Sequence, residues 1–168
     1  MIIRLTKKLA KKIHSLDAMN NLLPAKNPYL DWSANLFRSE QVQYIIITNT
    51  VSLYSMIMPG RGITDHKNFI DGVMIAMRDF LIVDDNEAIY SLFIEPNISP
   101  MMFAKSLNRS VTGSMRELIF EAQFLFRYKD LSLWDISRRM NETPMTLIQN
   151  LSPFKVFKFM EFDQDSEM

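Results

Sequence analysis

The chain has 168 residues, 48% of them hydrophobic and 23% charged, which is typical of one folded domain and excludes intrinsic disorder. Its 19 basic and 19 acidic side chains cancel, so no overall field favours nucleic acid or a membrane surface, and any such site must be local. There is no cysteine, which excludes disulfides, thiolate catalysis and cysteine-based metal sites.

No run of the sequence approaches the ~18 consecutive apolar residues of a membrane span. The first residues, MIIRLTKKLAKK, lack the apolar core and the cleavage site of a secretory signal. We therefore expect a cytoplasmic protein.

The N-terminal residues predict a short strand followed by a basic helix. Ile2, Ile3 and Leu5 suit a strand, and Thr6 can cap a helix over residues 7–16 that has leucine, alanine and isoleucine on one face. The other face carries the strongest local charge signal in the chain, which consists of Lys7, Lys8, Lys11 and Lys12. These lysines are candidate nucleic-acid contacts, but a solvated helix face is the commoner role and no aromatic side chain is interleaved with them.

The next forty residues predict a loop, a helical turn and a hairpin. Residues 20–31 contain two prolines and several asparagines, which indicates a loop, and residues 32–37 suit one helical turn with Asp31 as its cap. Residues 41–48 and 51–58 are rich in β-branched and aromatic side chains and are separated by an asparagine–threonine pair. This pattern predicts a β-hairpin.

A second amphipathic helix is predicted over residues 64–82, with Thr64 as its cap. Before it, Arg61 lies between two glycines in a turn that matches no phosphate-binding motif. After it, residues 88–94 and 100–106 have strand character.

The most regular pattern in the chain is an amphipathic helix over residues 110–127, where apolar side chains recur every three or four residues. Ser114 and Glu117 have the spacing of a capping box, but we place the start earlier, near Ser110. This start leaves Gly113 inside the helix and needs a reason such as the close approach of another backbone. Asn108, Arg109 and Ser110 form a candidate anion site, because helix N-terminal amides and a guanidinium together bind phosphate. The commoner alternative is a capped helix whose arginine pairs with a nearby carboxylate or carbonyl.

Three segments carry a resemblance to a known family: MIIRLTKKLAKKI, LDWSANLFRSEQVQYIIITN and LNRSVTGSMREL. From Met1 to about Pro144 the chain resembles an uncharacterised bacterial family of small domains of unknown function, found alone or beside a plasmid-encoded ORF-3-like domain. The resemblance implies no catalytic or binding residues and no cofactor. Because some members of the family occur beside a plasmid-encoded domain, the resemblance suggests a role in mobile genetic elements or host defence.

The C-terminal part is less regular. Residues 131–140 fit neither the helix nor the strand period cleanly, so both structures stay open. Ser152 and Pro153 suit the cap and the first residue of a short helix. Residues 161–168 are acidic, and we expect them to form a frayed tail after a single domain over residues 1–160.

The candidates for catalysis are two histidines and two arginines. His14 and His66 have no partner at the spacing of a zinc motif, so we predict no metal site and no cofactor. If the fold brought them together with Arg61 or Arg109, these groups could cleave RNA by acid–base catalysis, as in a toxin-like ribonuclease. Isolated histidines more often have surface or capping roles.

These observations predict a single α+β domain: a mostly antiparallel sheet of four or five strands with about three packed amphipathic helices, near residues 7–16, 64–82 and 110–127. The favoured function is a non-catalytic cytoplasmic binding module whose partner is a protein or a nucleic acid, and a homo-oligomer is compatible with it. The alternative is a small phosphodiester-cleaving enzyme that uses the histidines and arginines. An enzyme should gather histidine, arginine and carboxylate side chains in one concave pocket, and a binding module need not.

Overall fold

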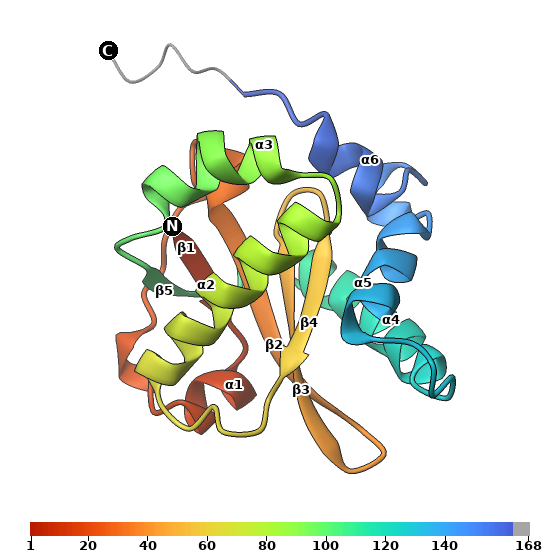
Figure 1. The fold of residues 1–168 in the computed structure, drawn as a ribbon. Helices are drawn as coiled ribbons and strands as arrows, with labels where there is room; N and C mark the ends of the chain where they lie inside the picture. Colours follow the sequence, from red (N-terminus) through yellow and green to blue (C-terminus); the bar gives the residue numbers. More distant parts are fainter. Residues whose placement is uncertain (163–168) are drawn as a thin grey trace.

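A computed structural model of the chain describes residues 1–162, which fold into three layers with one mixed sheet in the middle (Figure 1). The strands are β1 (Ile2–Leu5), β2 (Asp31–Ser39), β3 (Val42–Asn49), β4 (Ser55–Pro59) and β5 (Met102–Lys105). The helices are α1 (Lys7–Lys12), α2 (His66–Val83), α3 (Glu87–Ile89), α4 (Arg109–Leu125), α5 (Leu133–Glu142) and α6 (Pro153–Lys158). Short turns of other helix types are η1 (Leu16–Ala18), η2 (Pro28–Leu30), η3 (Tyr90–Ile94), η4 (Glu95–Asn97) and η5 (Thr146–Ile148). Most of the predicted acidic tail, from residue 163 onward, lies outside the described residues.

The sheet has five strands in the order β4-β3-β2-β1-β5. β2, β3 and β4 form an antiparallel meander, whereas β1 pairs in parallel with both β2 and β5. The predicted α+β class is confirmed, although the parallel pairs around β1 and the helices α1 to α6 go beyond the prediction. Parallel neighbours need long crossovers, which are supplied here by α1 with its following loop and by α2 with α3.

The two faces of the sheet bury two different hydrophobic cores. Successive residues of a strand point to opposite faces, so Ile45 and Ile47 belong to one core and Ile46 to the other. The first core packs under α1 and α2, and the second packs under α4 and α5 (Figure 1). Helices α2 and α4 therefore cover opposite sides of the molecule.

Two predicted elements are wrong. Residues 32–37 belong to β2 and not to a helical turn, because their side chains are buried on both faces: Trp32 in the first core and Phe37 in the second. Residues 88–94 are helical and not a strand, because Tyr90 and Ile94, four residues apart, are buried while Leu92 between them is 67% exposed.

The helix ends follow local capping chemistry, in places one or two residues from the predicted cap. Thr6 caps α1 as predicted, but α1 ends at Lys12. Asp65, not Thr64, caps α2, and Asn108 caps α4, so that α4 starts one residue before Ser110. Side-chain oxygens of this kind accept hydrogen bonds from amides that the helix leaves unpaired.

The later helices resolve what the sequence left open. Residues 133–142 form α5, which starts with a reciprocal capping box between Ser132 and Asp135. Ser152 caps α6 and Pro153 is its first residue, as predicted. Gly113 lies inside α4, but a Cβ there would meet no atom within 4 Å, so the expected close approach of another backbone is wrong.

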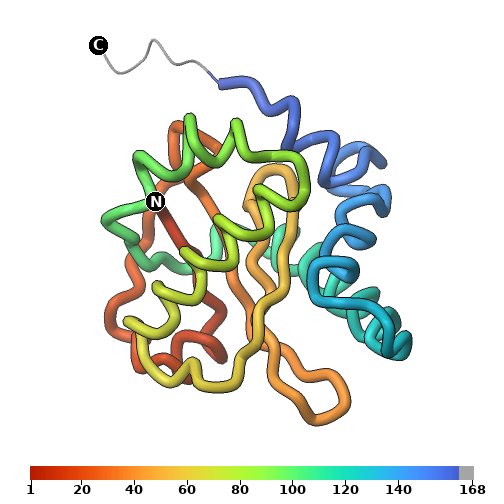
Figure 2. The backbone as a smooth tube through the Cα atoms, viewed as in Figure 1, coloured from red at the N-terminus to blue at the C-terminus, as the bar shows by residue number. Residues whose placement is uncertain are grey.

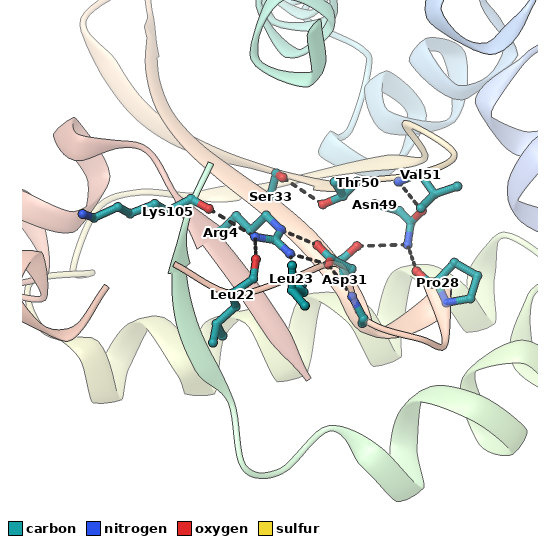
Figure 3. Close-up of polar contacts among 11 residues, drawn as sticks. Arg4, Leu22, Leu23, Pro28, Asp31, Ser33, Asn49, Thr50, Val51 and Lys105 are labelled. Carbon is teal, nitrogen blue, oxygen red and sulfur yellow. Dashed lines mark hydrogen bonds and ion pairs between the residues drawn. The ribbon is translucent and has the colours of Figure 1, made fainter. Parts of the chain in front are cut away.

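A buried ion pair holds the loop before β2 against the sheet (Figure 3). The Arg4 guanidinium donates to both carboxylate oxygens of Asp31 at 2.8 Å, and both side chains are almost fully buried. It also donates to the carbonyls of Leu22, Leu23 and Lys105, while Asp31 accepts from the amide of Ala25. Arg4 therefore does not add to the surface charge of the α1 lysines.

The C-terminal helix closes one end of the first core with aromatic side chains. Phe157 is fully buried and its ring lies 4.3 Å from that of Tyr54, 5.2 Å from that of Tyr29 and 5.8 Å from that of Trp32. Figure 2 shows the course of the backbone after α6. The rings of Phe162, in this last segment, and of Phe93, in η3, are 5.5 Å apart. Contacts between rings at these distances are favourable in addition to the apolar area that they bury.

Candidate nucleic-acid interface

The outer face of α4 carries a row of arginines and aromatic residues. The helix buries Val111, Met115, Leu118, Ala122 and Leu125 against the sheet and α5. On the opposite face lie Arg109, Gly113, Arg116, Phe120 and Phe124, and Arg127 and Tyr128 follow just after the helix; we call these seven residues the α4 stripe. The five helical residues recur at intervals of three and four, and Arg127 and Tyr128 both contact Phe124, so the stripe forms one continuous surface.

The three aromatic side chains of the α4 stripe are unusually exposed. Phe120 is 77% exposed, Phe124 51% and Tyr128 50%. Large aromatic residues are usually buried, and an isolated exposed one needs no explanation, but three at intervals of four residues, two on α4 and one just after it, form an apolar surface. Such a surface is a candidate binding site.

Three arginines flank these rings, two before Phe120 and one after Phe124. The guanidinium carbon of Arg127 lies 5.5 Å from the centre of the Phe124 ring, which in turn makes an edge contact with Tyr128 at 6.1 Å. Arg109 and Arg116, both exposed, lie at the N-terminal end of the stripe. Together with Ser106, Asn108, Thr112 and Gly113 they line an open cavity of about 490 Å³.

The N-terminus of α4 adds partial positive charge to this cavity. The Asn108 side chain accepts from the amide of Val111 at 3.0 Å, so it caps the helix. The amides of Arg109 and Ser110 belong to the first turn, where the helix itself supplies no acceptor. Because Gly113 has no side chain, the cavity stays open at its centre.

Few carboxylates offset this charge. Glu117 is exposed beside the stripe. Glu121 accepts a hydrogen bond from Thr143 Oγ1 at 2.6 Å, and desolvation raises its pKa, which favours the neutral form. The exposed pair between Lys129 and Glu40, 2.6 Å apart, neutralises both charges next to Tyr128. The α4 stripe itself contains three arginines and no carboxylate, while Glu117, Glu121 and Asp130 lie beside it.

The other predicted binding residues lie on a different surface. Lys7, Lys8 and Lys11 are exposed on α1, and Lys12 donates to Gln43 Oε1 at 2.8 Å. Because α1 packs on the same face of the sheet as α2, these lysines are not brought together with the α4 stripe. Of the predicted anion site, Asn108 serves as the cap, Arg109 lines the cavity and Ser110 is exposed in the first turn.

The candidate catalytic residues do not gather in a pocket. His14 follows α1 and His66 is the first residue of α2, and both are exposed, as is Arg61 in the turn before α2. Within residues 1–162, no hydrogen bond or ion pair joins either imidazole to another side chain. Arg109 lies on the other side of the sheet. The described residues also contain no group of three histidine, aspartate or glutamate side chains that could hold a metal ion.

A second cavity, of about 330 Å³, is lined by Asp84, Asp85, Arg138, Glu142 and Phe154. Its buried carboxylate is already engaged, because Asp84 accepts from Tyr54 Oη at 2.5 Å and from Arg138 Nε at 2.9 Å. Burial and the neighbouring Asp84 charge raise the pKa of Tyr54, which keeps the phenol protonated as a donor. This network joins the end of α2 to α5 and to the segment before β4.

The aromatic part of the α4 stripe was missed from the sequence. The helical period of residues 110–127 predicts a buried face of Val111, Met115, Leu118, Ile119, Ala122, Leu125 and Phe126, and this face does not include Phe120 or Phe124. The signal was present, because two phenylalanines four residues apart on the polar side of an amphipathic helix contradict its hydrophobic period.

The fold and this surface define a small α+β domain with an exposed basic and aromatic helix. The chain belongs to the family described as a domain of unknown function, DUF6933, whose model matches residues 2–156. Comparisons with curated proteins and with solved structures gave no significant match. Among the described residues, no helix combines the length and the apolar character that crossing a membrane requires.

Proposed function

We propose that this domain is a non-catalytic binding module for single-stranded nucleic acid and that the α4 stripe is its contact surface. The observation that carries the proposal is the presence of three arginines and three exposed aromatic rings on one surface, along the outer face of α4 and just after its end. Proteins that bind single strands combine cations that follow the phosphate backbone with aromatic side chains on which bases stack. The α4 stripe supplies both.

The geometry favours single strands over a duplex. Stacking on Phe120, Phe124 or Tyr128 requires a base whose face is free, and in a duplex both faces of each base are covered. From Arg109 to Phe124 the stripe is about 22 Å long, from a rise of about 1.5 Å per helical residue. It can therefore contact several successive nucleotides, with a phosphate held in the cavity beside Arg109 and Arg116.

A protein partner is the second candidate, because aromatic residues at helical spacing are also typical of protein interfaces. The arginines at both ends of the row favour a polyanion instead. A setting in mobile elements or host defence stays a prediction that the resemblance to the family suggests. The phosphodiester-cleaving alternative is less favoured, because His14 and His66 lie on the side of the sheet opposite to Arg109.

The test compares two variants that lose the same charge. Replacing Arg109, Arg116 and Arg127 by glutamine should weaken binding of a labelled oligothymidylate in fluorescence anisotropy. It should also reduce the slope of log affinity against log salt by about 2, because each phosphate contact to a single strand contributes about 0.7. The matched control replaces Lys7, Lys8 and Lys11 by glutamine. In this variant the slope of log affinity against log salt should stay close to that of the unmodified protein.

Three results would contradict the proposal. The first is that the unmodified protein does not bind the oligothymidylate, the second is that the arginine and lysine variants lose affinity equally, and the third is that only the lysine variant loses affinity. The last result would move the nucleic-acid surface to α1. Binding to duplex as tight as to single strands would remove the role assigned to stacking.

A further inference from the structure

The outer face of α2, on the side of the sheet opposite to α4, is a second surface with exposed apolar side chains. Met74 is 38% exposed, Ile75 54% and Ile82 42%. In Figure 1 this helix lies in front of the sheet, and no other described element covers it. Two charged residues, Asp71 and Arg78, flank the central Met74 and Ile75 on the same face.

The spacing of these residues makes the surface complementary to itself. Asp71 and Arg78 are seven residues apart, so they lie within about 20° of one line along the helix. The midpoint between them falls between Met74 and Ile75. A two-fold axis through that point aligns an antiparallel copy of α2 so that Asp71 faces the partner's Arg78 and Arg78 faces the partner's Asp71. Met74 and Ile75 then lie against the same residues of the copy.

The monomer leaves these groups available. Arg78 Nε donates to Asp79 Oδ1 at 2.9 Å, but both side chains are about half exposed, and an exposed pair of this kind is weak. The terminal guanidinium nitrogens of Arg78 have no acceptor within residues 1–162. A cavity of about 330 Å³, lined by Asp71, Met74, Ile75, Arg78 and Tyr90, lies beside the helix and can accept an apolar side chain.

We propose that two copies of this chain form a two-fold dimer through antiparallel α2 helices, with two reciprocal Asp71–Arg78 pairs around a centre of Met74 and Ile75. The inference does not depend on the proposed function. If both hold, the dimer leaves its two α4 stripes on the outside, because α2 and α4 cover opposite faces of the sheet. Two such surfaces on one particle would increase avidity for a long strand.

The test is a charge exchange in the full chain, followed by sedimentation equilibrium. Asp71→Arg and Arg78→Asp each replace two attractive pairs by two repulsive ones, so each variant alone should dimerise at least about tenfold more weakly. An equimolar mixture should form a heterodimer, because the two arginines of one chain then face the two aspartates of the other. The double variant, which exchanges both charges, should regain the dimer.

The control is Phe124→Asp, which alters the α4 stripe and should leave the dimer intact. Circular dichroism should show that all variants are folded, since the changed positions are exposed. A monomeric unmodified protein, single variants that dimerise like it, or a mixture that associates no better than its components would overturn the inference. A dimer lost only in Phe124→Asp would also overturn it and would assign the interface to α4.

Discussion

The variant Asp31→Ala should lower the free energy of unfolding by about 3–5 kcal/mol, the usual cost of leaving one member of a buried ion pair without its partner. Arg4 is 1% exposed and its guanidinium is held between Asp31 and three backbone carbonyls. Without the carboxylate, the positive charge stays in a medium that solvates it poorly. The amide of Ala25 also loses its acceptor, so the loop before β2 should loosen. Urea denaturation measures the loss.

Two further variants separate the cost of an unpaired charge from the net value of the pair. Lys129→Ala breaks an ion pair of similar length whose side chains are 73% and 62% exposed, and it should change stability by no more than about 1 kcal/mol. Replacing both Arg4 and Asp31 by methionine and leucine should cost less than Asp31→Ala alone, because no charge is left buried. Similar stability of Asp31→Ala and the unmodified protein would show that water reaches Arg4 in solution.

The variant Phe157→Ala should cost about 3–5 kcal/mol, as expected for removing a fully buried phenylalanine. The ring contacts Tyr29 and Trp32, which lie just before and at the start of β2, and Tyr54, which precedes β4. In addition, Tyr29 Oη donates to the carbonyl of Phe157 at 3.0 Å. Helix α6 has six residues, too short to be stable by itself, so it depends on this anchor.

Phe159→Ala is the matched control, because it removes the same ring two residues further on, at a position that is 74% exposed. It should change the melting temperature little, whereas Phe157→Ala should lower it by about 6–20 °C. Equal shifts in the two variants would mean that α6 does not close the core in the way described.

The elements that could be predicted from the sequence are those that local chemistry determines. The strand at Ile2–Leu5, the cap at Thr6 and the Ser152–Pro153 helix start depend on a few neighbouring residues. Helix α4 could be predicted because its buried apolar side chains recur with the helical period and most of its charged side chains lie between them. Amphipathic α2 follows the same rule.

The errors arise where tertiary contacts override the local pattern. β2 lies in the middle of the sheet and is buried on both faces, so its sequence lacks the alternation that identifies a strand. The turn that joins it to β3 uses Glu40 and Gln41 at positive φ, not the asparagine and glycine that usually signal such a turn. The parallel position of β1 depends on contacts with β5, about a hundred residues away in the chain.

The candidate site could be predicted only in part. Arg109 was selected because helix N-termini with arginine favour anions, and the structure places it at the edge of a cavity. The lysines of α1 were selected by charge alone, and the sequence did not show that they and α4 occupy opposite faces of the sheet. The exposure of Phe120 and Phe124 depends on what packs around α4, which no local pattern specifies.

The central claim is that bases stack on the rings of the α4 stripe, and the most direct test is the affinity of Phe120→Ala/Phe124→Ala for a single-stranded oligonucleotide. Both rings are exposed, so the double variant should remain folded. Loss of stacking costs about 1–3 kcal/mol per base, so binding should weaken at least about tenfold, while Phe159→Ala, an equally exposed ring outside the stripe, should bind like the unmodified protein. Equal affinity of the double variant and the unmodified protein would contradict the claim.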